Sequence, residues 1–329
     1  MRDHEPLIEV EGIAKRFGDV VAVDSVAFAV QRGELFGFLG PNGAGKTTTI
    51  NMLTGLARPD AGTIRIAGID CSKKPRAAQH LMGVVPDESN LYPELSGFAN
   101  LCFCGSLYGM RKRDRESRAR ELLGQFGLAD AAKRKFGGYS RGMKRKLTIA
   151  AGIIHAPPIL FLDEPTTGID VASARQIRQL IAHMNARGTT IFLTTHYIEE
   201  AERLCRRIAF IVKGRIVRTD TVEDLMRQSE GRHVVQFAFS GKSAELSDEI
   251  TAEFPHLHCQ AVVGGGIRVE SAEPIRVGPL VRLLEDRGAE VSEARKMRPS
   301  LEEVFVRITG IEAAAMKQEK DKAKIGGGT

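Results

Sequence analysis

The sequence of 329 residues is long enough for roughly two domains of about 150 residues each, and its 27% charged and 43% hydrophobic residues are typical of globular proteins. Its net charge of +6 permits contact with nucleic acid or anionic lipid without requiring it, and much of the excess lies in two runs, 111–120 and 133–146, that we interpret as solvated helix faces. No segment approaches the roughly 18 apolar residues of a membrane-spanning helix, and five scattered cysteines indicate reduced thiols rather than a disulfide framework.

The N-terminal region predicts β-strands. Residues 1–6 contain no apolar core, so we expect no signal peptide and a cytoplasmic location. Segments 7–10 and 20–30 alternate apolar and polar residues as strands do, with a turn expected at 15–18. The turn carries Phe17, which either packs in the core or stacks on a flat base.

The most specific motif begins where a short apolar strand at 35–39 breaks into glycines and restarts as a helix. Glycines let successive backbone N–H groups point inward around a phosphate chain, and the helix N-terminus adds partial positive charge. A lysine then neutralises the outer phosphates, and the next hydroxyl is placed to ligate Mg²⁺. This P-loop predicts ATP binding by Gly40, Pro41, Asn42, Gly43, Ala44, Gly45, Lys46, Thr47 and Thr48.

Strands are predicted next at 63–66 and 81–85, the second ending at Pro86 and Asp87. Ser96 is a plausible N-cap for a helix over 98–107, and the spacing predicts another helix over 111–126. Ser140 and Gly142 open a further helix that runs to residue 154. Free N–H groups at that helix start make it a second candidate anion site.

Two carboxylates end a strand at 159–162 that is apolar on both faces, as central strands of parallel sheets are. Such strands bind ligands at their C-terminal ends. Asp163 is suited to hold Mg²⁺, and Glu164 is placed to polarise a water molecule against the terminal phosphate. Another central strand at 189–195 ends at His196, which we expect at the same sheet edge. A hairpin over 208–217 and a short helix at 225–228 close this domain.

The composition shifts near residues 229–231, and the remainder predicts the order βαββαβ of a small ferredoxin-like sandwich. The charged and then glycine-rich end predicts a disordered tail. We therefore expect an ATP-binding cassette at 1–230 with a helical subdomain at about 90–155, an accessory domain at 231–310 and a tail at 311–329.

Taken together, the P-loop, the Ser140 helix start, Asp163 with Glu164, Asp170 and His196 resemble the ATP-binding subunit of an ABC transporter over residues 7–228. The segment 298–310 is similar to the C-terminal extension of an export-type branch that includes drug and antibiotic efflux ATPases. The resemblance implies an α/β P-loop NTPase with a central, mostly parallel sheet, an antiparallel β edge and a helical subdomain.

In that family two cassettes pair head to tail. The resemblance therefore implies a second cassette as partner, in the form of a homodimer, and separate transmembrane permease subunits that dock near residues 90–95. It implies a peripheral position on the inner face of the cell membrane. By the same resemblance Glu164 would be the general base, His196 the γ-phosphate sensor and Phe17 the adenine-stacking ring. Ser140 and Gly142 would contact the partner's nucleotide, and Asp170 would bridge the dimer.

Two positions depart from the family pattern. Asp87 stands where glutamine is usual; it can still ligate Mg²⁺ but cannot donate a hydrogen bond while ionised. Arg141 replaces the usual first glycine of the signature motif, where it either crowds a close backbone approach or adds a cation beside phosphate. Two other functions stay open: a soluble cassette acting on nucleic acid or ribosomes, which the single cassette argues against, and a module that binds ATP without turnover. With export as the leading hypothesis, we expect no nucleic-acid partner.

Overall fold

The structure is a computed structural model that describes residues 6–227, 233–240, 243–262, 265–297 and 300–311. The chain divides into two compact units, one comprising the residues up to Val222 and those from Ile308, the other comprising Glu223–Arg307. Most of the expected tail, from residue 312 onward, lies outside the described residues.

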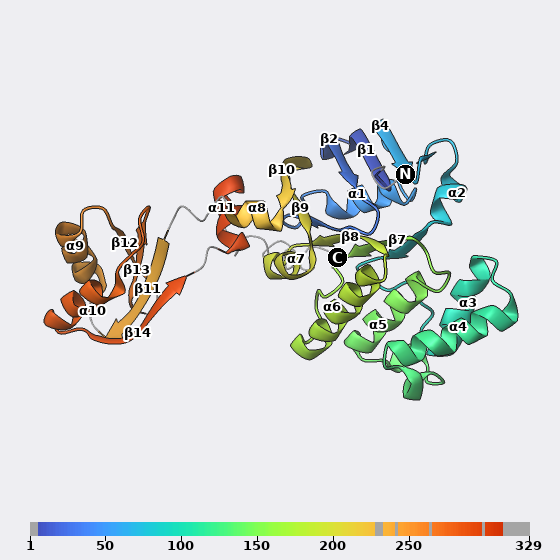
Figure 1. Cartoon of the computed structure of the whole chain (residues 1–329). Helices are drawn as coiled ribbons and strands as arrows, with labels where there is room; N and C mark the ends of the chain where they lie inside the picture. The colour runs from blue at the N-terminus through green and yellow to red at the C-terminus, as the bar shows by residue number, and fades with distance from the viewer. Residues whose placement is uncertain (1–5, 228–232, 241–242, 263–264, 298–299, 312–329) are drawn as a thin grey trace, which may run out of the picture. The chain divides into compact units, whose positions relative to one another are not determined.

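A six-stranded sheet lies at the centre of the first unit (Figure 1). Five of its strands are parallel, and the edge strand β10 is antiparallel to its neighbour. The strands β7 and β8 are buried at every position, as expected for parallel strands covered on both faces. The spatial order is β10 (Arg215–Thr221), β9 (Arg207–Val212), β3 (Leu35–Leu39), β8 (Thr190–Thr195), β7 (Ile159–Asp163) and β6 (Met82–Val85).

An antiparallel sheet covers one side of this unit, and aromatic side chains pack between the two sheets. The ring of Phe28 lies 5.6–5.7 Å, centroid to centroid, from those of Phe36, Phe38 and Phe192. Such pairs each contribute about 0.5–1.5 kcal/mol beyond their area burial. The antiparallel sheet has the order β2 (Val20–Val30), β1 (Ile8–Phe17), β4 (Ala61–Ile66) and β5 (Ile69–Asp70).

The turn expected at residues 15–18 is shorter than predicted. Strand β1 continues through Phe17 and pairs that residue with Val20, so only residues 18 and 19 form the turn. The Phe17 side chain is 55% exposed and is therefore not part of the core.

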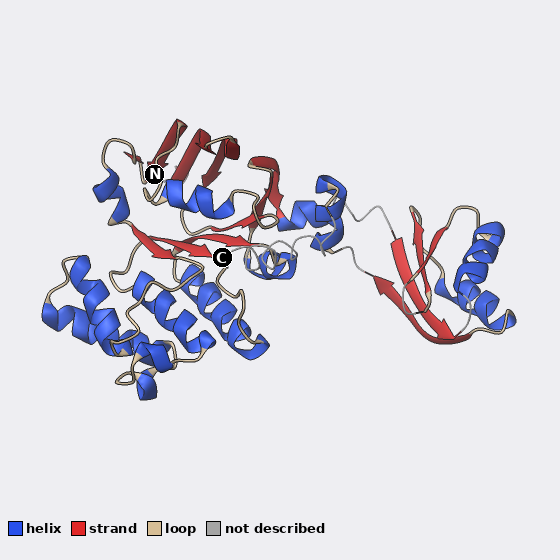
Figure 2. Ribbon diagram, turned by 180° about the vertical axis from the view of Figure 1, so that it is seen from behind, coloured by secondary structure: helices blue, strands red, loops and turns tan. Residues whose placement is uncertain are grey.

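Helices cover the central sheet on both faces, with α1 lying between the two sheets and α5 and α6 on the opposite face (Figure 2). The short helices α2 and α7 were not predicted, because five and seven residues are too few to establish a helical period. The helices of this unit are α1 (Lys46–Leu53), α2 (Pro75–Gln79), α3 (Gly97–Leu107), α4 (Lys112–Gln125), α5 (Arg141–Gly152), α6 (Val171–Ala186) and α7 (Ile198–Leu204), with 3-10 turns at Ala129–Ala131 and Phe136–Gly138.

The Glu223–Arg307 unit contains a four-stranded antiparallel sheet in the order β12-β13-β11-β14, the ferredoxin-like arrangement predicted from the sequence. Its core includes Phe237, Ile250 and Leu284. Edge strand β14 exposes six of its eight side chains. From Val222 onward, the helices and strands are α8 (Val222–Arg227), β11 (His233–Ser240), α9 (Ser243–Glu253), β12 (His258–Ala261), β13 (Ile267–Ser271), α10 (Val277–Asp286), β14 (Glu290–Met297) and α11 (Leu301–Thr309).

None of the helices within the described ranges is long and apolar enough to cross a membrane.

Candidate nucleotide site

The P-loop lies between β3 and α1 and requires glycine at two positions. A Cβ atom on Gly40 would lie 2.2 Å from the main-chain oxygen of Ile211 on β9. Gly45 has a φ of +101°, and a Cβ there would lie 2.4 Å from the main-chain oxygen of Ala22. The loop is therefore packed closely against β9 of the central sheet and β2 of the antiparallel sheet, which fixes the orientation of its backbone N–H groups.

Lys46 is buried at the start of α1, and its ammonium group faces the loop. Nζ donates to the main-chain oxygens of Gly40 at 2.8 Å and Pro41 at 3.1 Å. It also lies 3.2 Å from Oε1 of Glu164 at the end of β7. The sequence placed this lysine and this carboxylate in separate motifs 118 positions apart, and the fold brings the two charges into contact.

Asp163 lies at the sheet edge, where two hydroxyl groups bind its carboxylate. Thr47 Oγ1 donates to Oδ2 at 2.9 Å, and Thr194 Oγ1 donates to Oδ1 at 2.5 Å. Burial raises the pKa of the Asp163 carboxyl, and these two hydrogen bonds oppose that shift. A hydroxyl and a carboxylate side by side are hard oxygen donors, so they fit the ligand preference of Mg²⁺.

Glu164 is held by charged and polar groups from three segments. His196 Nδ1 lies 2.8 Å from Oε2, Thr167 Oγ1 donates to the same oxygen at 3.0 Å, and Lys46 faces the other oxygen. Burial alone would raise the pKa of this carboxyl, but the hydrogen bond from His196 and the charge of Lys46 outweigh it, so the pKa lies below its ordinary value. Glu164 is therefore ionised at neutral pH.

The backbone of Glu164 is also unusual, because its φ of +49° lies in the left-handed region that non-glycine residues rarely adopt. The amide N–H donates to the main-chain oxygen of Thr194 at 3.0 Å, which anchors the residue to β8. Strain of this kind is found at functional sites where the surroundings fix the conformation.

The other predicted motif residues lie apart from the P-loop. Ser140 is the N-cap of α5 and accepts from the amide of Met143 at 3.3 Å, while Asp170 is the N-cap of α6 and accepts from the amide of Ser173 at 2.9 Å. A Cβ on Gly142 would lie 2.4 Å from Ser173 Oγ, so the two helix starts are packed together. These helices and α1 are on opposite faces of the sheet (Figure 1).

One buried cation was missed by sequence reasoning. The run 133–146 was interpreted as a solvated face, but Arg145 is only 6% exposed, and its guanidinium group donates to main-chain oxygens beside both Asp87 and Glu164. Its position on the buried face of α5, three residues before the buried Thr148, is the signal that could have found it.

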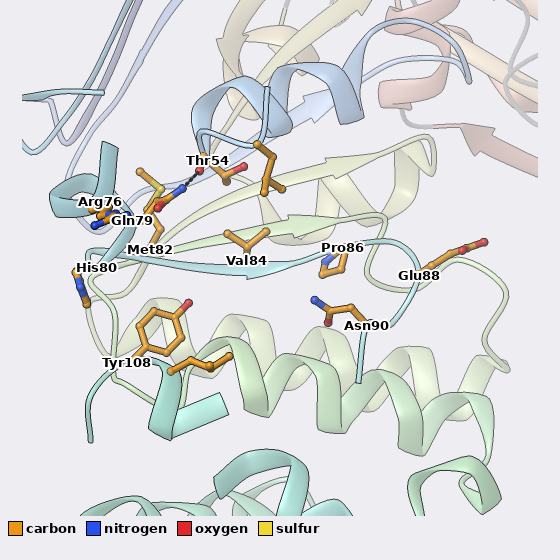
Figure 3. A pocket seen from close by; sticks show the side chains of 12 residues that line it. Thr54, Arg76, Gln79, His80, Met82, Val84, Pro86, Glu88, Asn90 and Tyr108 are labelled. Atoms are coloured by element: carbon orange, nitrogen blue, oxygen red, sulfur yellow. Dashed lines mark hydrogen bonds between the residues drawn. The ribbon is translucent and has the colours of Figure 1, made fainter. Parts of the chain in front are cut away.

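A cavity of about 600 Å³ lies beside β6 (Figure 3). Its wall includes the β6–α3 loop at Asn90, the first residue of the segment expected to contact permease subunits. The side chain of Gln79 donates to the main-chain oxygen of Thr54 across one end of it at 3.1 Å. Leu56 and Leu107 contribute apolar side chains that are 70% and 68% exposed.

The P-loop, the acidic end of β7 and the parallel sheet define a P-loop ATPase of the cassette class. A sequence profile of the ABC transporter family matches residues 23–167. The linearmycin resistance ATP-binding protein LnrL of Bacillus subtilis is 34% identical over 92% of this chain and 98% of its own length. The Nod factor export ATP-binding protein I of Burkholderia lata is 39% identical over 93% and 97%.

Solved structures agree with this assignment. The ATP-binding subunit of an ABC transporter superposes with a TM-score of 0.62 at 31% identity, covering 68% of this chain and 93% of that one. A dimeric ATP-binding cassette bound to ADP and Pi in a post-hydrolysis state gives 0.61 at 26% identity, over 65% and 98%. The chain belongs to the ABC transporter family. It is an ATP-binding and ATP-hydrolysing subunit that energises export, and these similarities do not favour action on nucleic acid or ribosomes.

Proposed function

We propose that this subunit hydrolyses ATP with Mg²⁺ between two paired cassettes, and that closure of the pair drives export through separate membrane subunits. The observation that carries the proposal is the placement of Glu164: an ionised, buried carboxylate between Lys46 and His196 at the edge of the sheet that holds the P-loop. A carboxylate so placed can accept a proton from water that attacks the terminal phosphate.

Each neighbour of Glu164 has its own part in the reaction. Lys46 neutralises charge on the outer phosphates, and its present contact with Glu164 is released when a phosphate takes up that charge. His196 orients the carboxylate through Nδ1, which leaves its other ring nitrogen to contact the γ-phosphate. Phe17, exposed at the end of β1, stacks on the adenine ring.

Thr47 and Asp163 would hold Mg²⁺, with Asp87 as a third oxygen donor from the β6–α3 loop. The bound ion supplies a positive charge that offsets the charge developing on the transferred phosphoryl group. The Asp163 carboxylate is held in place by hydrogen bonds from Thr194 to one oxygen and from Thr47 to the other.

A second cassette completes the site. Ser140 and Gly142 at the start of α5 would contact the nucleotide of the partner, and Asp170 would bridge the two copies. Two features support this: the α5 start is separated by the sheet from the P-loop of its own chain, and a related cassette was solved as a dimer with ADP and Pi. The simplest pair is a homodimer, at the inner face of the cell membrane.

The cavity beside β6 is the proposed docking site for a short amphipathic helix of a permease subunit. Its exposed Leu56 and Leu107 side chains offer apolar contacts, and Arg76 and His80 offer polar ones. Replacing Leu107 with Asp is expected to abolish co-purification with membrane subunits. The matched control Val217→Asp, at a 45% exposed position on β10 outside the cavity, is expected to keep it. Equal recovery with both variants would contradict the docking site.

The test of the proposed reaction is Glu164→Gln, which keeps the shape of the side chain and removes the base. We expect ATPase activity to fall about 100-fold or more, with ATP-bound dimers accumulating in size-exclusion chromatography. Lys46→Ala is expected to abolish ATP binding itself. A Glu164→Gln variant that is monomeric and turns over ATP at the normal rate would remove Glu164 as the base.

A further inference from the structure

The buried guanidinium group of Arg145 joins three segments around the site. Its Nε donates to the main-chain oxygen of Pro165 at 3.0 Å, and one terminal nitrogen, Nη2, donates to that of Asp163 at 2.5 Å. The other, Nη1, donates to the main-chain oxygens of Pro86 and, at 3.1 Å, of Asp87. All these acceptors are main-chain oxygens. Arg145 therefore holds the backbone in place and does not pair with a carboxylate side chain through these bonds.

The two acceptors at the C-terminal end of β7 lie on either side of one residue. Asp163 and Pro165 flank Glu164, whose backbone has the left-handed conformation described above. Left-handed backbone at a non-glycine residue persists only when neighbouring contacts hold it. Arg145 donates hydrogen bonds to the residues immediately before and immediately after Glu164, and these two contacts restrain the backbone conformation of Glu164.

Only arginine offers the required geometry, since its rigid planar fork presents N–H groups in different directions at once. Burial lowers the pKa of this guanidinium, while the surrounding carboxylates, Asp87 first among them, oppose the shift. The charge therefore remains in place beside the acidic groups of the site.

The helix that carries Arg145 begins at Ser140. About one and a half turns of α5 separate the helix start from the guanidinium group. A displacement of the helix start therefore moves the donors that hold both the Asp87 loop and the Glu164 backbone.

We propose that Arg145 is a positioning residue for ATP hydrolysis: it holds Glu164 in its left-handed conformation and links it mechanically to the Asp87 loop and to helix α5. This inference rests on the proposed role of Glu164 as the base. It also gives a physical reason why one cation of the basic run 133–146 is buried while its neighbours are not.

The test replaces Arg145 with Met and measures ATPase kinetics and nucleotide affinity in the full chain. We expect kcat to fall about 100-fold, the size of effect that a misplacement of about 1 Å produces. Affinity for ATP is expected to stay within about twofold, because Arg145 contacts no residue of the P-loop among its hydrogen bonds. The matched control is Lys146→Met, which removes the neighbouring cation and its hydrogen bond to Gln176 and is expected to leave kcat unchanged. An unchanged kcat in Arg145→Met, or an equal loss of affinity and kcat, would overturn the inference.

Arg145→Lys separates geometry from charge and serves if the Met variant does not fold, as judged by circular dichroism. One ammonium group cannot reach the acceptors on both sides of Glu164, so Lys is expected to lose about as much activity as Met. Full activity with Lys would show that only the positive charge matters, and it would refute the requirement for the planar guanidinium group.

A double-mutant cycle tells this inference apart from the proposed function on which it rests. If Arg145 acts through Glu164, adding Arg145→Lys to Glu164→Gln is expected to cost nothing further in residual turnover. A full additional loss would show that Arg145 acts independently of Glu164. Normal turnover in Glu164→Gln alone would instead remove the base, whatever Arg145 does.

Discussion

Thr194→Val is a nearly isosteric change that tests how the hydroxyl groups hold the acidic edge of the sheet. Thr194 is fully buried, and its hydroxyl donates to Asp163 Oδ1 at 2.5 Å. Valine keeps the volume and removes the donor, leaving Thr47 as the remaining hydroxyl partner of that carboxylate. The same strand offers a matched control, Thr190→Val, because Thr190 is equally buried and accepts from the amide of Gly33 at 2.8 Å.

The loss of unfolding free energy is expected to be larger for Thr194→Val than for Thr190→Val, and to depend on pH only for Thr194→Val. Losing a hydrogen bond to a charged carboxylate costs about 1.5–3 kcal/mol of unfolding free energy, whereas a neutral bond contributes about 1 kcal/mol. The Thr194 bond also lowers the pKa of Asp163, so its loss raises that pKa further above the ordinary value of 3.8. Between 3.8 and the raised pKa the folded state holds a proton that the unfolded state has released, so stability falls as pH rises through this window. The cost of Thr194→Val is therefore larger at pH 7.5 than near pH 4.

Urea unfolding in EDTA at several pH values measures both effects on the metal-free chain. We expect the Thr194→Val penalty to shrink as the buffer is acidified and the Thr190→Val penalty to stay constant. Equal, pH-independent penalties for the two variants would refute the hydrogen-bond account of Asp163.

Three further outcomes are expected. Phe17→Ala should weaken ATP binding by about 1–3 kcal/mol, measured by titration, if its exposed ring makes the proposed stacking contact with the adenine; unchanged affinity would exclude stacking. Asp87→Gln should preserve or raise ATPase activity if Asp87 only substitutes for the usual glutamine, whereas a collapse would show that aspartate itself is required. Burial lowers the pKa of His155 to about 4, so stability should fall as pH drops from about 6.5 to about 4, where only the unfolded state takes up the proton. His155→Gln should reduce the total loss of stability over this pH range by less than about 3 kcal/mol, since the ring is only half-buried and solvent screens its charge; an unchanged pH dependence would contradict the burial.

Much of the cassette could be predicted because its elements have strong local signals. The P-loop strand, the buried strand ending at Asp163 and the N-caps at Ser96 and Ser140 all follow from patterns within about ten residues, and the structure confirms these elements. The contact of Lys46 with Glu164 could only be inferred from the rule that parallel strands share a ligand-binding edge.

Features that depend on tertiary contacts were out of reach. Arg145 looks like any cation in a basic run until β6 and β7 are packed beside its helix, and the cavity beside β6 is formed by segments that share no motif. The left-handed backbone of Glu164 carries no sequence signal either, because a glutamate before proline is ordinarily extended.

The exposed edge strand β14 carries charged side chains that disfavour the addition of a further strand. Its outward side chains include Glu290, Glu293, Arg295 and Lys296, two acids and two bases on the free rim of the ferredoxin-like sheet. Charged rims of this kind discourage another strand from adding on, because each incoming chain would have to strip water from ionised groups. The charged side chains of β14 therefore disfavour a continuous intermolecular sheet along this edge, and with it the growth of fibrils from the ferredoxin-like unit.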